Sequence, residues 1–310
     1  MHIPVLLQEV LAVLDPKPGE FIIDGTLGMG GHAKVIIDRI APGGTFLGVD
    51  RDSRAVDAFN RLADFSSLKN GFVASGSYQT LPDIVQNQYL GRADGILLDL
   101  GFSSEQIDGS FGGRGFSFLK DEPLLMTYSD DDEPLNQKLR TLSQSEIETI
   151  LREYGEERYA KSIASVISER KNEIKTTIDL VGAVIEATPT WYQEGRIHPA
   201  TKTFQAFRIY VNQEFDHLKE ILASLPELLK PGARIAIISF HSLEDRIVKE
   251  YFKEHATRSA MNKYAKSSET VEGFRLKIVS KKPIVATKEE IKINPRARSA
   301  KLRGAIVQSL

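Results

Sequence analysis

A glycine-rich turn between an apolar run and a helical pattern near the N-terminus is the feature that most constrains this fold. Residues 21–23 are apolar, two of them are β-branched, and Asp24 closes the run, as expected at the end of a buried strand. Residues 25–32 contain four glycines, and residues 33–40 carry apolar side chains at helical spacing. Strand, glycine loop and helix together open a nucleotide-binding βαβ unit, in which backbone N–H groups approach the ligand because glycine has no Cβ.

Two kinds of cofactor fit this loop. Residues 28–33 match the dinucleotide-binding pattern G-x-G-x-x-A, but in that pattern the first glycine follows the strand almost directly, whereas residues 24–27 intervene here. An acidic residue at the strand end followed by glycines is typical of S-adenosylmethionine (SAM) methyltransferases. We therefore predict that the loop, with Asp24 and Gly28, binds SAM.

A second acidic residue fits either cofactor. Residues 45–50 form a predicted strand that ends in Asp50, and a carboxylate there can accept hydrogen bonds from both ribose hydroxyls. The alternative is that Asp24 and Asp50 only order the turns that follow their strands.

Two further predicted strands end near the same ligand. Residues 71–74 precede Tyr78, which either stacks on the adenine or packs in the core. Residues 93–99 are nearly all apolar, as in a strand buried on both faces, and end in Asp99. Because ligands of open α/β sheets bind at the carboxyl ends of the strands, Asp99 is expected beside the methyl group of the bound SAM.

The pattern changes after about residue 105. Residues 108–118 form a glycine- and aromatic-rich loop, and residues 143–186 have a helical pattern without clear strands. Strand patterns return at residues 234–238, with a candidate edge strand at residues 274–279. We predict an α/β fold, a Rossmann-like SAM methyltransferase sheet with an inserted all-helical domain. The methyltransferase domain would comprise residues 1–108 and 204–310, and residues 109–203 would recognise the substrate.

Composition limits the classes of protein that fit. The 310-residue chain has no cysteine and a formal net charge of −2, and 41% of its residues are hydrophobic. No apolar run is long enough for a signal peptide or a membrane span, which predicts a cytoplasmic protein with no membrane partner. The histidines show no metal-ligand spacing, so no catalytic metal is expected.

The charge is unevenly distributed along the chain. Residues 231–310 hold 17 Lys and Arg against 8 Asp and Glu, and the rest of the chain is correspondingly acidic. A basic last quarter indicates a polyanionic partner that contacts this region, with a solvated basic tail as the alternative.

Taken together, these motifs closely resemble the bacterial MraW (RsmH-type) family. Two stretches are especially specific, Ser-Phe-His-Ser-Leu-Glu-Asp-Arg from residue 239 and Asn-Pro-Arg-Ala-Arg-Ser from residue 294. The matching stretches are residues 2–7, 24–32, 49–52, 95–104, 114–118, 154–158, 198–201, 203–206, 239–249 and 294–303.

The resemblance implies a SAM-dependent methyltransferase that modifies N4 of a cytidine in the 16S rRNA of the small ribosomal subunit. It also implies which residues bind SAM: Gly30, Gly31 and His32 in the loop, Asp50 at the ribose, Tyr78 near the adenine, Asp99 at the methyl-bearing end, and Gln106 just beyond.

The sequence departs from the family pattern at three positions. Tyr78 stands where family members usually carry Phe, which keeps an aromatic ring. Leu125 and Thr127 stand where the family typically carries an acid and an arginine. If the family's pair holds the cytidine, activity or substrate choice would change here. If the family's acid and arginine only pair with each other, the loss of both opposite charges together leaves no unpaired charge.

The expected chemistry needs a group that accepts a proton from the cytosine amine. Asp99 is the predicted catalytic acceptor, with cofactor binding as its alternative role. Ser103, Ser104 and His241 are second-line candidates, and a structural hydrogen-bonding role is favoured for His241.

The RNA would be bound by basic and aromatic groups. The predicted phosphate contacts are Arg296, Arg298, Lys301 and Arg303. Base stacking or internal packing is expected for Phe111, Phe116 and Phe118.

Two other functions remain open from the sequence. One is a SAM methyltransferase that acts on a small molecule or a protein, and the other is a non-catalytic relative that binds the ribosome. The sequence is compatible with a homodimer but does not determine the oligomeric state, nor whether naked rRNA or the assembled subunit is the substrate.

Overall fold

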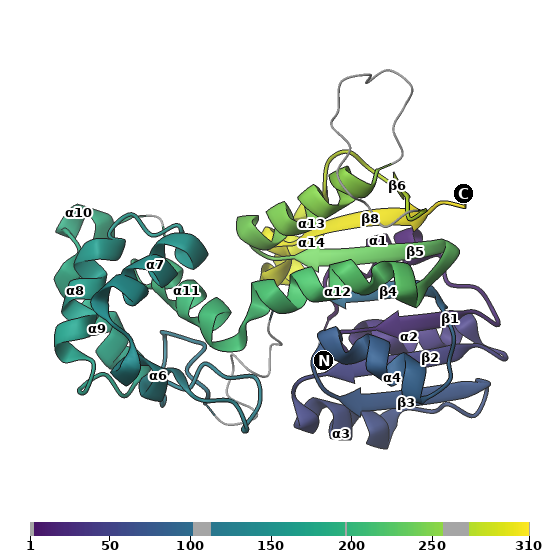
Figure 1. Ribbon diagram of the computed structural model, residues 1–310, viewed down its shortest axis with the longest axis horizontal. Coiled ribbons are helices and arrows are strands. Elements are labelled where there is room, and N and C mark those ends of the chain that lie inside the picture. Colours follow the sequence, from purple (N-terminus) through teal and green to yellow (C-terminus); the bar gives the residue numbers. More distant parts are fainter. Residues whose placement is uncertain (1–2, 102–112, 196, 257–272, 310) are drawn as a thin grey trace. The chain divides into compact units, whose positions relative to one another are not determined.

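The computed structural model describes residues 3–101, 113–195, 197–256 and 273–309. The chain divides into two compact units (Figure 1). Unit 1 comprises Met1–Gly101 and Phe215–Leu310, and unit 2 comprises Phe102–Glu214.

Unit 1 is built on a mostly parallel sheet with the strand order β3-β2-β1-β4-β5-β8-β6, and β7 also pairs with β8. The first five strands in that order are parallel, whereas β8 runs antiparallel to β5 and β6. The strands are β1 (Phe21–Asp24), β2 (Thr45–Asp50), β3 (Asn70–Ser75), β4 (Ala93–Asp99), β5 (Leu229–Ser239), β6 (Leu276–Ile278), β7 (Ile284–Val285) and β8 (Lys301–Val307).

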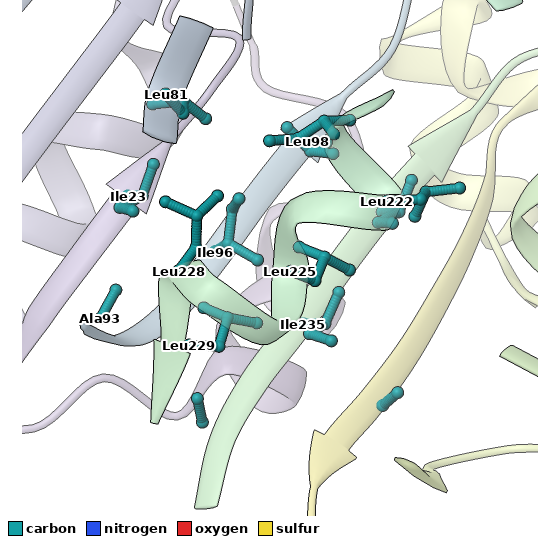
Figure 2. Packing of buried hydrophobic residues seen from close by; sticks show 14 of the residues in the cluster. Ile23, Leu81, Ala93, Ile96, Leu98, Leu222, Leu225, Leu228, Leu229 and Ile235 are labelled. Atoms are coloured by element: carbon teal, nitrogen blue, oxygen red, sulfur yellow. The ribbon is translucent and has the colours of Figure 1, made fainter. Parts of the chain in front are cut away.

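The sheet carries an apolar core on each face, which explains the nearly continuous apolar runs of its central strands. On one face, Leu222, Leu225 and Leu228 of a long helix pack against side chains of β4 and β5 such as Ile96 and Ile235 (Figure 2). These three leucines recur every third residue, so they share one side of the helix and are at most 1% exposed.

The helices of unit 1 alternate with the parallel strands, as in a doubly wound fold. They are α1 (Leu7–Leu14), α2 (Gly31–Ile40), α3 (Ser53–Leu62), η1 (Tyr78–Thr80), α4 (Leu81–Asn87), α12 (Glu214–Leu228, whose first residue belongs to unit 2), α13 (Ser242–His255), α14 (Lys288–Ile293) and η2 (Pro295–Ser299). This architecture confirms the predicted Rossmann-like α/β fold.

The strand register brings distant residues to the carboxyl edge of the parallel strands. Asp99 is the partner of Ile238, and Ile238 is the partner of Leu302. Because β8 is antiparallel to β5, the residues just before β8 lie at the same edge as Asp99. The short helix η2 is therefore brought to this edge although it is about 200 residues away in sequence.

Strand β8 corrects one prediction. The sequence predicts phosphate contacts at Lys301 and Arg303, but Lys301–Val307 form an inner strand of the sheet. Lys301, Arg303 and Gly304 interrupt the apolar pattern that would have indicated a strand. The candidate edge strand at residues 274–279 is confirmed by β6, which ends the strand order.

Strand β5 begins earlier than expected. The sequence predicts a strand over residues 234–238, whereas β5 starts at Leu229. The register with β4 shifts between Ala93 and Gly95, and the exposed residues 230–232, with Gly232 at φ +86°, form an irregularity within the strand.

The described part of unit 2 is mainly helical and has its own apolar core. Ser143 and Thr176 begin α7 and α9 as the N-cap residues of capping boxes with Glu146 and Asp179. The helices are α6 (Leu135–Thr141), α7 (Gln144–Gly155), α8 (Ala160–Arg170), α9 (Thr177–Ala187), α10 (Thr190–Gln193) and α11 (Thr201–Asn212). Among the described residues of both units, no helix is long and apolar enough to cross a membrane.

Candidate active site at the carboxyl edge of the sheet

The glycine loop is tied to the strands on both sides of β1. The Gly25 N–H donates to the Leu97 carbonyl of β4 at 3.0 Å, and the Leu27 N–H donates to the Val49 carbonyl of β2 at 2.9 Å. Gly30 has φ +74°, and a Cβ there would lie 2.1 Å from the Phe59 ring, so only glycine fits. At Gly28, with φ +50°, no atom lies within 4 Å of the Cβ position, which leaves open space beside the backbone for a ligand.

Asp50 is held in place by the loop that it faces. Its carboxylate accepts hydrogen bonds from the Gly28 N–H at 2.7 Å and from the Asp52 N–H at 2.9 Å. Burial raises the pKa of Asp50, while these two hydrogen bonds act in the opposite direction. The carboxylate is thereby fixed at the end of β2 with lone pairs left for further donors.

Asp24 is the most buried acid of the site, with 1% of its surface exposed. Its carboxylate accepts a hydrogen bond from the Thr26 N–H at 3.1 Å. Burial raises the pKa of Asp24 to about 7, although His32 and the hydrogen bond from Thr26 oppose the shift. A neutral Asp24 is therefore accessible near neutral pH in the unliganded protein.

Asp99 lies at the end of β4, where its backbone N–H donates to Thr26 Oγ1 at 2.6 Å. Its side chain is 23% exposed, but its Oδ1 is buried and has no hydrogen-bond partner within the described residues. Burial raises the pKa of Asp99 to about 7, against the lowering influence of Arg296, while Glu244 raises it further. A buried carboxylate oxygen without a partner is costly unless a ligand supplies the donor.

His32 connects the loop to the N-terminal segment and faces Asp99. Its Nε2 lies 3.0 Å from the Val5 carbonyl, and because a carbonyl only accepts, Nε2 carries the proton. Its Nδ1 is 3.9 Å from Asp99 Oδ2, which is too long for a direct hydrogen bond. Burial lowers the pKa of His32, so the neutral ring is favoured.

The other predicted cofactor residues lie around the same loop or outside the described residues. Tyr78 begins η1 just after β3 and is half-buried. It lies beside the loop, because a Cβ built at Gly25 would be 3.2 Å from the Cβ of Tyr78. Gly31 is the first residue of α2, and a Cβ at this position would lie 3.2 Å from the ring of Pro4. Gln106 lies outside the described residues, as do Ser103, Ser104 and Phe111.

Three groups of the site were missed by sequence reasoning. Gln79 Oε1 is buried without a partner in the described structure, next to Tyr78. Arg296 acts electrostatically on Asp99 rather than only extending a basic tail. Residues 3–6 brace the site, since the Ile3 carbonyl accepts from Asn294 Nδ2 at 2.9 Å and the Leu6 N–H donates to Glu290 at 2.7 Å. Such long-range contacts leave no local pattern in the sequence.

The acids and the glycine loop thus meet at one edge of a doubly wound sheet, and comparison with known proteins identifies the family. The sequence pattern of the MraW methylase family matches residues 1–308. The chain belongs to the MraW methylase family.

Relatives of the family cover nearly the whole chain. The protein named "Ribosomal RNA small subunit methyltransferase H" of Trichlorobacter lovleyi is 43% identical over 308 residues, which covers 98% of this chain and 97% of that one. A protein of the same name from Thermotoga neapolitana is 43% identical over 309 residues, covering 98% and 95%. A solved structure of a SAM-dependent O-methyltransferase from Thermotoga maritima is 10% identical with a TM-score of 0.40, covering 100% of this chain and 68% of that one.

Thr127, one of the departures from the MraW pattern, has a structural partner within unit 2. The Arg114 Nη1 donates to the Thr127 carbonyl at 3.1 Å and to its hydroxyl at 3.0 Å, and Arg114 also pairs with Asp130. Arg114 and Thr127 are both buried, and Leu125 follows the buried Leu124. Thr127 therefore serves as an anchor for Arg114 in this chain.

One predicted phosphate contact is corrected, and one open alternative for a phenylalanine is decided. Arg303 is 9% exposed, and its guanidinium forms two hydrogen bonds with Asp245 at 2.6 and 3.1 Å, so it is committed to the packing of β8. Phe116 is also 9% exposed and stacks on Tyr128 with ring centroids 5.4 Å apart, which supports the packing alternative. His241 is the N-cap of α13 in a capping box with Glu244, in line with its favoured structural role.

Proposed function

We propose that this protein transfers a methyl group from SAM to the exocyclic N4 of a cytidine in the 16S rRNA of the small ribosomal subunit. The observation that carries the proposal is the cluster of Asp24, Asp50 and Asp99 around the glycine loop, in a chain that matches the MraW methylase family over residues 1–308. The substrate class follows from relatives whose printed names make them methyltransferases of small-subunit ribosomal RNA.

The residues of the edge fit SAM. Asp50 would accept hydrogen bonds from the ribose hydroxyls, because two backbone N–H groups already orient its carboxylate. The open space at Gly28 leaves room along the loop, with Gly30, Gly31 and His32 lining the turn into α2. SAM, when bound, supplies an electrophilic methyl group on a cationic sulfonium.

Other residues at the same edge of the sheet would bind the adenine and methionine ends of SAM. Tyr78 would border the adenine, and the buried Gln79 Oε1 offers an acceptor for its amino group. Asp24 and Asp99 would lie near the methyl-bearing end, where the cationic sulfonium would favour their ionised forms and lower the raised pKa of each carboxyl. Gln106 completes the proposed set.

Asp99 would accept the proton that the reaction releases. The N4 amine of cytosine is a weak nucleophile because its lone pair is delocalised into the ring, so alignment with the methyl group supplies much of the rate. As the N–C bond forms and the C–S bond breaks, one N4 proton must leave. We expect the Asp99 oxygen that has no partner in the described structure to accept this proton.

Fewer basic residues of the C-terminal segment than predicted are available to contact RNA phosphates. Arg298 is exposed in η2, whereas Lys301 is 3.7 Å from Asp245 and Arg303 is paired with the same carboxylate. A cytoplasmic site of action and a homodimer remain parts of the proposal, as does substrate recognition by residues 109–203.

Methylation of isolated small subunits tests the proposed function. Subunits from cells that lack this modification would be incubated with the protein and methyl-labelled SAM, and the RNA digested to nucleosides. Label in N4-methylcytidine is the expected result. Absence of label, with SAM binding intact, would refute the proposed substrate. Reversion of Thr127→Arg together with Leu125→Asp would then test whether the family's charged pair is required.

A further inference from the structure

We propose that unit 2 binds single-stranded RNA along a surface of aromatic rings and basic groups, formed by Phe118, Arg158, Trp191, His198 and Lys202, here named the ring–cation path. The inference deepens the proposed function by naming the surface that would hold the rRNA next to the target cytidine, and it rests on that function for its biological substrate.

Trp191 is the most distinctive part of the ring–cation path. It is the single tryptophan of the chain and is 58% exposed, an unusual state for the largest apolar side chain. It lies in the four-residue helix α10, and its ring contacts Tyr159 and Tyr192 edge-on, with centroids 6.1 Å from each. The ring is thus supported by two other aromatic side chains, while most of its own surface remains in solvent.

A buried carboxylate makes this support rigid. Glu157 is 3% exposed and accepts hydrogen bonds from the Tyr192 hydroxyl at 2.9 and 3.1 Å and from the Tyr159 N–H at 2.8 Å. The Glu157 carboxylate is thus buried and hydrogen-bonded inside unit 2. A rigid, supported ring loses little conformational entropy when a planar partner stacks on it.

Arg158 adds a cation to the exposed ring. Its guanidinium carbon lies 5.5 Å from the Trp191 ring centroid and 5.9 Å from that of Tyr159. The residue is exposed, and within the described residues no carboxylate forms an ion pair with it. A guanidinium beside an exposed indole offers both a phosphate contact and a stacking surface, the two elements of single-strand recognition.

Lys202 is linked to both parts of the ring–cation path. Its Nζ donates to the Glu156 carbonyl at 2.9 Å, which holds it beside the turn that carries Arg158. At the other side, Thr201 begins α11 next to Lys202, and its N–H donates to the His198 carbonyl at 3.0 Å. The lysine therefore bridges the two ends of the ring–cation path.

A second stacked pair forms the other end of the path. The rings of Phe118 and His198 are nearly parallel, with centroids 4.5 Å apart and an interplanar angle of 12°. Phe204 supports Phe118 from its edge, at 5.5 Å. His198 is exposed and Phe118 half-buried, so the imidazole presents the outer face of this stack. Aromatic and imidazole rings are the usual platforms for unpaired bases.

The chemistry favours RNA over a protein partner. A nitrogen-bearing group accompanies each ring group of the ring–cation path: Arg158 lies beside the exposed Trp191, the imidazole of His198 stacks on the half-buried Phe118, and Lys202 adds a second cation. This combination matches the bases and phosphates of an unpaired strand. A surface for a protein would instead concentrate apolar side chains in its centre and exclude charges from it.

The single tryptophan allows a direct test with the full-length protein. Titration with a short, unstructured pyrimidine oligoribonucleotide, free of protein, should quench the fluorescence of Trp191 saturably. Trp191→Ala should weaken RNA binding about tenfold, as loss of one stacking platform implies, and Trp191→Phe should restore most of the affinity. Affinities of these variants would be measured by the anisotropy of a labelled RNA.

The cations have a separate readout and a matched control. Arg158→Gln and Lys202→Gln should each weaken RNA binding several-fold and reduce the slope of log affinity against log salt by about 0.7. Arg152→Gln removes an exposed arginine of α7 that pairs with Glu148 outside the path, and it should change neither quantity. SAM affinity should stay the same in all these variants.

Three outcomes would overturn the inference. The first is RNA binding without any change in Trp191 fluorescence, and the second is unchanged RNA affinity in Trp191→Ala. The third is a loss seen with assembled small subunits but never with protein-free RNA, which would assign the ring–cation path to a ribosomal protein. The proposed function is tested separately, because it fails only if the wild-type protein makes no N4-methylcytidine.

Discussion

Replacing Asp99 with Asn should stabilise the unliganded protein, and the gain should grow with pH. The Asp99 carboxyl is placed where burial raises its pKa to about 7 from 3.8. Between these two values the folded state holds a proton that the unfolded chain has released. Wild-type stability therefore falls as the pH rises through this window, and Asn, which carries no charge, avoids the loss.

The size of the effect follows from the pKa difference. Each pH unit between 3.8 and about 7 costs the wild type about 1.4 kcal/mol of folding free energy relative to the variant. From pH 5 to pH 8 the advantage of Asp99→Asn should increase by about 2 to 3 kcal/mol. The lower value allows for the 23% of the side chain that solvent reaches.

Urea denaturation at several pH values measures this difference directly, because the contributions of other groups largely cancel between the two proteins. Asp64→Asn provides a contrast: hydrogen bonds from Ser66 lower the pKa of that exposed carboxyl below 3.8, so it is ionised in both states from pH 5 to pH 8 and the difference from wild type should stay constant there. A difference between wild type and Asp99→Asn that is constant from pH 5 to pH 8 would show that Asp99 titrates normally and would refute the raised pKa.

Three further predictions concern the site. Asp50→Ala should abolish SAM binding in calorimetry while the fold, followed by circular dichroism, is retained; unchanged affinity would remove Asp50 from the cofactor site. Gly30→Ala should lower stability by about 2 kcal/mol or more and weaken SAM binding, because its Cβ would lie 2.1 Å from the Phe59 ring at φ +74°, and an unperturbed melting temperature would contradict this. With saturating SAM and RNA, kcat should rise with pH and level off at or below about 7, since the bound cation favours ionised Asp99. Asp99→Asn should remove this dependence and lower kcat by about a hundredfold or more with SAM affinity retained, whereas loss of both would make Asp99 a cofactor ligand.

The α/β core could be predicted because its evidence is local. A strand buried on both faces must be apolar throughout, and residues 93–99 show this directly. The glycine loop could be placed for a similar reason, since a turn with φ +74° at Gly30 and a backbone open to a ligand requires glycine. Confirmation of the family through residues 1–308 shows that the quoted motifs were sufficient.

Strand β8 was missed for an equally physical reason. Arg303 is buried because Asp245, from a helix 58 residues earlier, neutralises it with two hydrogen bonds. In the sequence, an arginine in an apolar run indicates a solvent-exposed or nucleic-acid-binding residue. Only the tertiary pairing converts it into a residue of the sheet interior.

The sequence by itself determined the fold class, the glycine loop and the family, because these depend on periodicity, glycine and short motifs that neighbouring residues specify. The tertiary structure decided which charges remain available for chemistry. It directed Arg303 to Asp245, brought Arg296 within electrostatic reach of Asp99, and left Trp191 exposed on a rigid support. Burial and charge pairing depend on residues far apart in the chain, and these contacts set both the pKa of a carboxyl and the partners that a side chain can still bind.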